Sequence, residues 1–158
     1  SIILLVLLGL TQPLLTQQIK NHRLLTSLQS LYQSMQRARI LAITQSTFVT
    51  VCPSKEGYFC DDSPDWHDGW IVFLDPLKVG QPSSQEALVE IKESVDKLVL
   101  SSGRRVRTRF SPEGTAYGHN LTIIACSRET EPLPRLVLSN AGRIRWEPVS
   151  STEKCTKF

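Results

Sequence analysis

The sequence predicts an α+β fold in which a long N-terminal helix, half membrane-anchoring and half amphipathic, packs on antiparallel β-sheet. Two observations predict it. No Gly or Pro occurs between Pro13 and Pro53, so one continuous helix can fill much of the first third of the chain. Short apolar runs separated by Gly, Pro, Asp and Ser follow, without further helical segments that could connect parallel strands. The strands are therefore expected to pair antiparallel.

The helical segment changes character at Lys20, its first charged residue. The uncharged stretch before Lys20 is only just as long as the roughly 20 apolar residues that a membrane span needs. We interpret residues 1–19 as the membrane-anchoring half of the helix; a signal-like segment and a core helix are the alternatives. In residues 20–46, apolar residues recur at steps of four and three and predict a core-facing stripe: Leu24, Leu28, Leu31, Met35, Ala38 and Ala42.

Basic residues concentrate in the last third of the chain. The chain has 18 Lys and Arg against 15 Asp and Glu, a formal charge of +3. Residues 103–158 hold 10 basic and 5 acidic residues, whereas residues 1–102 have a net charge of −2. Such a block is typical of a solvated basic face, and also of a surface that binds nucleic acid or an anionic membrane.

Four cysteines lie beyond the helical segment and include no C-x-x-C pair, so they lack metal-ligand spacing. If the apolar segment places the following domain outside the cytoplasm, disulfide bonds are expected. Three connectivities are open. We favour Cys52 with Cys60, which would close a short loop, and Cys126 with Cys155, which would hold the C-terminal tail.

Short strands are expected through the domain of residues 47–158, wherever β-branched and aromatic residues are bounded by turn-forming residues. The Trp70–Leu74 run is apolar at every position, so both of its faces are expected to be covered, one of them by the helix. The expected strands are Phe48–Val51, Trp70–Leu74, Ala87–Ile91, Leu98–Leu100, Arg104–Phe110, Leu121–Cys126, Arg135–Ser139 and Arg143–Trp146.

One of these strands, Arg104–Phe110, alternates arginine with packing residues. Alternate residues of a strand share a face, so a basic stripe is expected there. We interpret it either as a solvated sheet face or as a secondary surface for DNA or a partner. Its residues are Arg105, Arg107 and Arg109, with Arg104 beside them.

The last two expected strands flank a three-residue connection that ends in Gly142, which can adopt positive φ in a hairpin. Beyond it, Arg143 and Arg145 are expected on one face, with Ile144 and Trp146 pointing to the core. The two guanidinium groups would lie roughly 7 Å apart along the strand. Such a pair can bind phosphate oxygens bidentately.

No residue pattern indicates catalysis or a cofactor. The three histidines, His22, His67 and His119, lie outside any hydrolase or metalloprotease motif. The aspartates between Cys60 and Gly69 do not have EF-hand spacing, and solvated loop carboxylates are commoner than a Ca²⁺ site. We therefore expect no enzyme activity, no cofactor and no bound metal.

Five patches, in this order, support a family resemblance. They are the hydrophobic helix with its amphipathic half, then VTVCPS followed by Cys60, W-x-x-GWIVFLD, FSPEGTAYG and RLVLSNAGRIRW. Together they resemble the FimT/GspH family of minor type IV pilins and type II secretion pseudopilins, over nearly the whole chain. The resemblance implies a helical spine packed on β-sheet and a periplasmic domain anchored in the inner membrane. It also implies incorporation into a pilus or pseudopilus with other major and minor pilin subunits.

The start of the chain departs from the family pattern. Members have a prepilin leader and, just after its cleavage site, an aromatic residue and a glutamate, whereas this sequence begins with Ser1 and Ile2. We expect the sequence to begin just downstream of that glutamate.

The residues Gly142, Arg143, Ile144 and Arg145 resemble the G-R-x-R motif of FimT, the member linked to DNA uptake in natural transformation. The resemblance implies binding to the phosphate backbone of double-stranded DNA. Lys154 and Lys157 would join the site if Cys155 holds the tail near Cys126. Two alternatives remain: solvated charges that discourage sheet pairing at an edge strand, and a structural subunit that primes or caps a pilus without binding DNA.

Overall fold

The computed structural model describes residues 22, 25–93, 99–126 and 134–148. Its described elements are an N-terminal helix over residues 25–44, a short 3₁₀ helix, η1 (Gln85–Ala87), and eight strands. The strands are β1 (Val49–Pro53), β2 (Gly69–Leu74), β3 (Leu88–Glu93), β4 (Val99–Ser101), β5 (Thr108–Phe110), β6 (Leu121–Cys126), β7 (Arg135–Leu138) and β8 (Ile144–Glu147).

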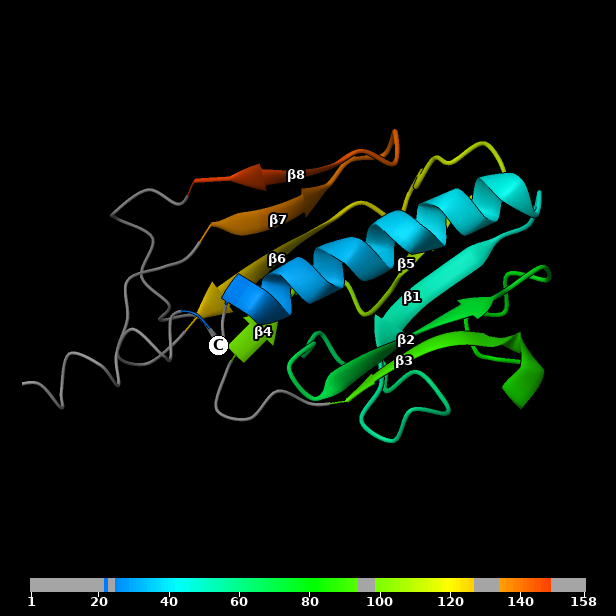
Figure 1. Cartoon of the computed structure of the whole chain (residues 1–158), viewed down its shortest axis with the longest axis horizontal. Helices are drawn as coiled ribbons and strands as arrows, with labels where there is room; N and C mark the ends of the chain where they lie inside the picture. Colours follow the sequence, from blue (N-terminus) through cyan, green and yellow to red (C-terminus); the bar gives the residue numbers. More distant parts are fainter. Residues whose placement is uncertain (1–21, 23–24, 94–98, 127–133, 149–158) are drawn as a thin grey trace, which may run out of the picture.

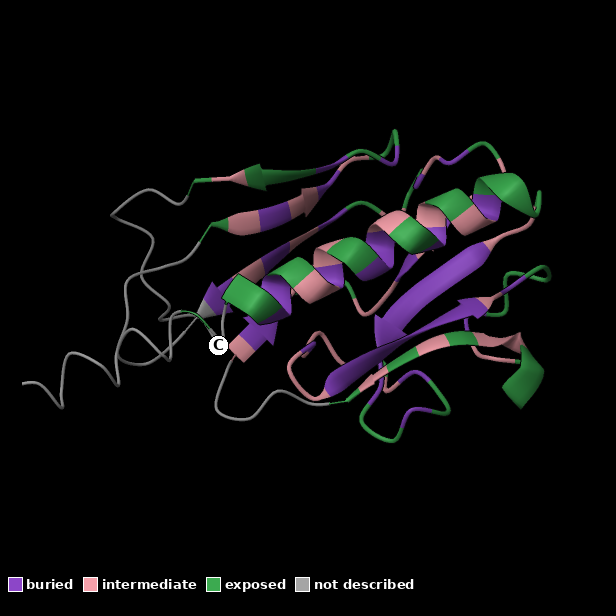
Figure 2. Ribbon diagram, viewed as in Figure 1, coloured by how far each residue is buried: buried purple, intermediate pink, exposed green. Residues whose placement is uncertain are grey.

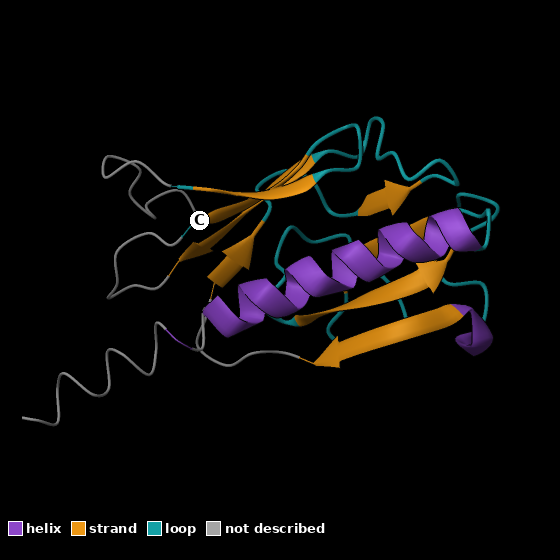
Figure 3. Cartoon of the chain, turned by 45° about the horizontal axis from the view of Figure 1, so that its top comes forward, coloured by secondary structure: helices purple, strands orange, loops and turns teal. Residues whose placement is uncertain are grey.

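The strands form two four-stranded sheets, and every pairing in them is antiparallel. The first sheet has the order β3-β2-β1-β5 and the second has the order β4-β6-β7-β8. The helix lies across the two sheets, with β1, β2 and β3 of the first sheet below it and β6, β7 and β8 of the second above it in Figure 1. Figure 3, turned by 45°, shows the same layers. The predicted α+β class with antiparallel sheet is confirmed.

The predicted helix stripe lies at the centre of the main core. Leu28, Leu31, Met35, Ala38 and Ala42 are all fully buried, and Leu24 lies outside the described residues. Residues of both sheets pack against this stripe, so the helix joins the sheets through one continuous cluster. Figure 2 shows the exposed residues of the helix on its solvent side and an entirely buried β1.

Strand β2 is covered on both faces, as its uninterrupted apolar run predicted. Trp70 and Val72 belong to the main core beside the helix. Ile71 and Phe73 point the other way and form a second cluster with the Cys52–Cys60 disulfide. That disulfide is the predicted one. The predicted pairing of Cys126 with Cys155 depends on a residue outside the described ranges.

The strand predicted over Arg104–Phe110 forms only at its end, as β5. Strands β4 and β5 belong to different sheets, so the chain must leave one ladder and cross to the other before it can pair with β1. Gly103, with φ of 70°, turns the chain after β4. Arg105 and Arg107 therefore lie in an irregular segment, and the alternation of the sequence does not continue along one strand.

Among the described residues, no helix has both the length and the apolar character that crossing a membrane requires. Residues 1–19, which we interpret as the membrane-anchoring half of the helix, lie outside the described residues.

Candidate nucleic-acid interface

The β7–β8 hairpin presents arginines on the outer face of the second sheet. Leu138 pairs with Ile144 across the strands, and Gly142 closes the turn with φ of 76°. Ile144 is buried in the main core. Because successive side chains of a strand point to opposite faces, Arg145 points away from that core, and Arg143 directly precedes β8 at the turn. Both are exposed, so they are accessible to a ligand.

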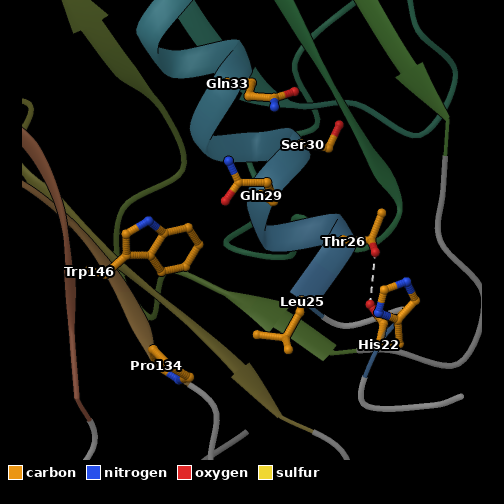
Figure 4. Close-up of a pocket in the computed structure, with 8 residues that line it drawn as sticks. All are labelled: His22, Leu25, Thr26, Gln29, Ser30, Gln33, Pro134 and Trp146. Atoms are coloured by element: carbon orange, nitrogen blue, oxygen red, sulfur yellow. Dashed lines mark hydrogen bonds between the residues drawn. The ribbon is translucent and has the colours of Figure 1, made fainter. Parts of the chain in front are cut away.

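Trp146 differs from the expectation that it points into the core. It lies on the same face of β8 as Ile144 but is 37% exposed, and its ring centroid is 5.7 Å from that of Tyr32 on the helix. Strand β8 is at the edge of its sheet, so the helix covers the indole on one side only. A groove of about 670 Å³ lies between the indole, Pro134 and the first turns of the helix (Figure 4).

One carboxylate binds two arginines of the hairpin. Glu147 Oε1 accepts hydrogen bonds from Arg145 Nε at 2.9 Å and Nη2 at 2.6 Å. Its Oε2 accepts one from Arg135 Nε at 3.1 Å, across the β7–β8 pairing. The hydrogen bond from Arg145 is the main reason that the pKa of Glu147 lies below its ordinary value. The three side chains therefore have a net charge of +1 at neutral pH.

Arg143 has no acidic partner in the part of the chain that the structure describes. Its backbone instead forms two hydrogen bonds with Ser139 that close the turn. Ser139 N–H donates to Arg143 O at 3.0 Å, and Arg143 N–H donates to Ser139 Oγ at 3.2 Å. The guanidinium group is thus the hairpin cation that a ligand can reach without displacing a carboxylate.

The loop of residues 111–119 is hydrogen-bonded to this turn. Ala116 N–H donates to Asn140 O at 2.9 Å, and Gly118 N–H donates to Asn140 Oδ1 at 3.2 Å. Gly142 approaches the same loop so closely that a Cβ atom there would lie 1.9 Å from Gly114 O. Arg39 of the helix donates to that carbonyl at 2.8 Å. These contacts among the helix, the loop and the turn fix the position of the Arg143 backbone.

The arginines around β5 are held by other parts of the chain. Arg109 forms an ion pair with Asp75 at 2.8 Å, with side chains 13% and 2% exposed. Arg107 donates to Gly80 O at 2.8 Å and pairs with Asp62. Arg105 instead contacts the loop of residues 111–119 and donates to Gly118 O at 2.7 Å. The structure therefore does not bring these three arginines together in one open stripe.

The remaining residues of the predicted site, Lys154 and Lys157, lie outside the described residues. The sequence reasoning did not single out three further residues of the hairpin that make contacts: Arg135, Asn140 and Glu147. The hairpin register could have revealed the contact between Arg135 and Glu147, because a three-residue connection places them opposite each other. Nothing in the sequence pattern indicated that Asn140 would bind a loop more than twenty residues earlier in the chain.

A family model described as Type II transport protein GspH matches residues 27–142, more than two thirds of the chain. The chain belongs to the GspH family. This is a family of minor pilins and pseudopilins, which are structural subunits rather than enzymes. Pilins and pseudopilins are membrane-anchored and assemble with other pilin subunits into pili. The GspH match includes Gly142 and ends there, just before the two exposed arginines.

The fold of this GspH-family chain is similar to that of two solved subunits. The type IV minor pilin FimU of Pseudomonas aeruginosa is 20% identical, with 85% of this chain and 93% of FimU covered and a TM-score of 0.65. The minor pseudopilin EpsH from the Type 2 Secretion System of Vibrio cholerae is 13% identical, with 84% and 99% covered and a TM-score of 0.55. A comparison with curated proteins gave no match. The predicted pilin-like fold is confirmed.

Proposed function

We propose that this chain is a minor type IV pilin that binds double-stranded DNA without sequence preference and supports DNA uptake in natural transformation. The single observation that favours this role is Arg143. It is an exposed arginine on a rigid turn, without an acidic partner in the described part of the chain. Arg145 follows two residues later on β8 and is also exposed. The resemblance of residues 142–145 to the G-R-x-R motif of FimT adds the link to DNA uptake.

The chemistry of this pair suits a phosphate backbone. Alternate side chains of a strand lie roughly 7 Å apart, a spacing comparable to that of successive phosphates on one DNA strand. Arginine binds phosphate oxygens bidentately through its planar guanidinium group. Contacts of this kind supply affinity that does not depend on base sequence.

Glu147 sets the order in which the two arginines engage. Arg143 can bind a phosphate directly, whereas Arg145 must exchange the Glu147 carboxylate for the phosphate. A single subunit should therefore bind weakly, and several subunits of one pilus would bind more tightly together than one alone. This role also requires an inner-membrane origin, a periplasmic domain and later incorporation into the pilus.

The test is a mobility-shift series against salt concentration with Arg143→Gln and Arg145→Gln combined. If these two arginines act with Lys154 and Lys157, about four phosphates are neutralised and the log–log salt slope should be about −4. The double variant should bind more weakly, with a slope shallower by about 2. A matched control, Arg37→Gln with Lys55→Gln, removes the same charge from exposed sites elsewhere.

Two outcomes would contradict the assignment. Unchanged binding by the double variant would exclude the hairpin arginines. Loss of binding only when Arg105 and Arg107 are replaced by Gln would move the site to the segment before β5.

A structural subunit without DNA binding is the second candidate, as a type IV minor pilin or a type II secretion pseudopilin that primes or caps assembly. It is favoured by the position of β8 at a sheet edge, where exposed charges discourage pairing with other strands. A deletion strain separates the two roles. Normal piliation and secretion with lost transformation would support DNA uptake, whereas lost piliation or secretion with normal DNA binding by the purified chain would support the structural role.

A further inference from the structure

The loop that supports the hairpin turn exposes a tyrosine for which the fold has no evident use. Tyr117 is 84% exposed, more than any other large apolar or aromatic side chain described. Its backbone is nevertheless well fixed, because His119 N–H donates to Ala116 O at 2.9 Å and Gly118 adopts φ of 76°. This is a β-turn with Tyr117 at its first central position. The turn thus fixes the backbone of Tyr117 while the phenol ring is exposed to solvent.

The same turn is bound to both neighbouring basic segments. Gly118 N–H donates to the Asn140 side chain of the hairpin turn at 3.2 Å. Gly118 O accepts a hydrogen bond from Arg105 Nη1 at 2.7 Å. Tyr117 therefore lies between Arg105 on one side and the turn that precedes Arg143 on the other. Figure 1 shows the loop after β5 beside the β7–β8 turn at one end of the molecule.

The turn that carries Tyr117 follows a segment with two exposed arginines and is bound by one of them. Arg104 and Arg105 are exposed, and neither has an acidic partner within the described residues. Glu113 is the acidic residue of the 111–119 loop, and its hydrogen bond with Ser111 lowers its pKa, so it is ionised at neutral pH. His119 adds no charge there, because burial and then Arg109 lower its pKa. Arg105 is thus the charged side chain that the structure places against the turn that carries Tyr117.

We infer that Tyr117 and Arg105 extend the proposed DNA surface into a site for single-stranded DNA, in which the phenol ring stacks on an unpaired base and Arg105 binds an adjoining phosphate. The inference rests on the proposed function and adds a substrate class to it. An exposed aromatic ring in a positive groove or surface is the usual platform for unpaired bases, and it tolerates any sequence. In a duplex the bases are already stacked on one another, so the ring has no base face to cover.

The two forms of DNA should therefore depend on different residues. Duplex binding needs the arginines and phosphates alone, whereas single-strand binding needs the arginines and the ring. Stacking on one aromatic side chain strengthens single-strand binding by about fivefold to about a hundredfold.

The experiment is fluorescence anisotropy with the full chain and two labelled probes, a single-stranded oligothymidine of about 12 nucleotides and a duplex of the same length. Tyr117→Ala should bind the single strand about five- to a hundredfold more weakly and the duplex within about twofold of the unchanged chain. Tyr117→Phe retains the ring and should bind both normally. Tyr58→Ala is the matched control, since Tyr58 is 58% exposed in the loop closed by the disulfide, beside the other sheet.

The outcomes separate this inference from the function on which it rests. If duplex binding depends on Arg143 but Tyr117→Ala leaves single-strand binding unchanged, the stacking site is wrong and the proposed function stands. If the unchanged chain binds neither probe, the proposed function fails and the stacking site fails with it. Equal losses on both probes would also overturn the inference, because they would show a contact that does not depend on unpaired bases. Thermal melting of each variant checks that the fold is retained.

Discussion

Two arginine-rich segments of this chain look alike in sequence and differ in the structure. Around β5, Arg109 is nearly buried against Asp75, and Arg107 is bound by a carboxylate and a carbonyl. On the β7–β8 hairpin, Arg145 shares one carboxylate with Arg135, and Arg143 is exposed at the turn. Arg107 and Arg109 of the first segment thus pair with carboxylates inside the domain, whereas Arg143 of the second remains available to a ligand.

The difference comes from what lies opposite each arginine rather than from the spacing of the arginines. Asp75 follows β2, and the order β2-β1-β5 places it within reach of Arg109 across one intervening strand. It also accepts hydrogen bonds from Thr50 Oγ1 at 2.7 Å and from Gly80 N–H at 3.1 Å. Strand β8 is at a sheet edge and meets only one neighbouring strand among the described elements. Fewer opposing elements leave fewer partners for its arginines.

The largest effect that separates the two segments is expected on stability, from Arg109→Gln. The substitution leaves Asp75 buried with an unpaired charge, so the free energy of unfolding should fall by about 3–5 kcal/mol. Urea denaturation of the variant measures this. The matched change Arg143→Gln should shift the free energy of unfolding by no more than about 0.5 kcal/mol, because that side chain is exposed. Equal losses in the two variants would show that the segments do not differ as described.

A smaller loss of stability is expected from Gly142→Ala, which tests whether the hairpin turn is fixed by its neighbouring loop. An L-residue at φ of 76° costs about 1–3 kcal/mol, and the new Cβ would also meet Gly114 O. Gly118→Ala is the matched control, since its φ is also 76° but nothing lies within 4 Å of its Cβ position. The Gly142 variant should have the lower free energy of unfolding. Equal values would mean that the close approach to Gly114 is unimportant.

A gain of affinity, rather than a loss of stability, is expected from Glu147→Gln. The substitution removes the carboxylate that competes with phosphate for Arg145 and Arg135. Affinity for duplex DNA in 0.1 M salt should rise by up to about tenfold, the effect of about one additional phosphate contact. Glu93→Gln, an equally charged change at an exposed site on β3, is the control for net charge. A Glu147 variant that binds no better than the Glu93 variant would contradict competition at the hairpin.

The smallest effect is expected in the pH dependence of stability. The folded chain lowers the pKa of Glu147 chiefly through its hydrogen bond with Arg145. A carboxyl whose pKa is lower in the folded chain stabilises the fold above its unfolded pKa of about 4.3, and loses that contribution as pH falls through the folded value. The unchanged chain should therefore be slightly more stable than Glu147→Gln at pH 7, and the difference should shrink as pH falls below the unfolded pKa of about 4.3. Thermal melting across this range measures it.

The sequence by itself determined the features that depend on near neighbours. The helix stripe from Leu28 to Ala42 follows from helical periodicity, and the double burial of β2 follows from its apolar run. The Cys52–Cys60 disulfide joins two residues only eight positions apart in the sequence, so it too was predictable. The glycine of the hairpin turn was predictable because the turn needs positive φ.

Only the tertiary structure decided which arginines have partners. Asp75 and Arg109 are separated by 34 residues, and Asn140 and Gly118 by 22, and both contacts exist because of the order in which strands and loops pack. The exposed Trp146 and the shortened β5 have the same origin, since one depends on an edge position and the other on a crossing between sheets. Periodicity specifies the face on which a side chain lies. The elements opposite that face decide whether its charge is neutralised.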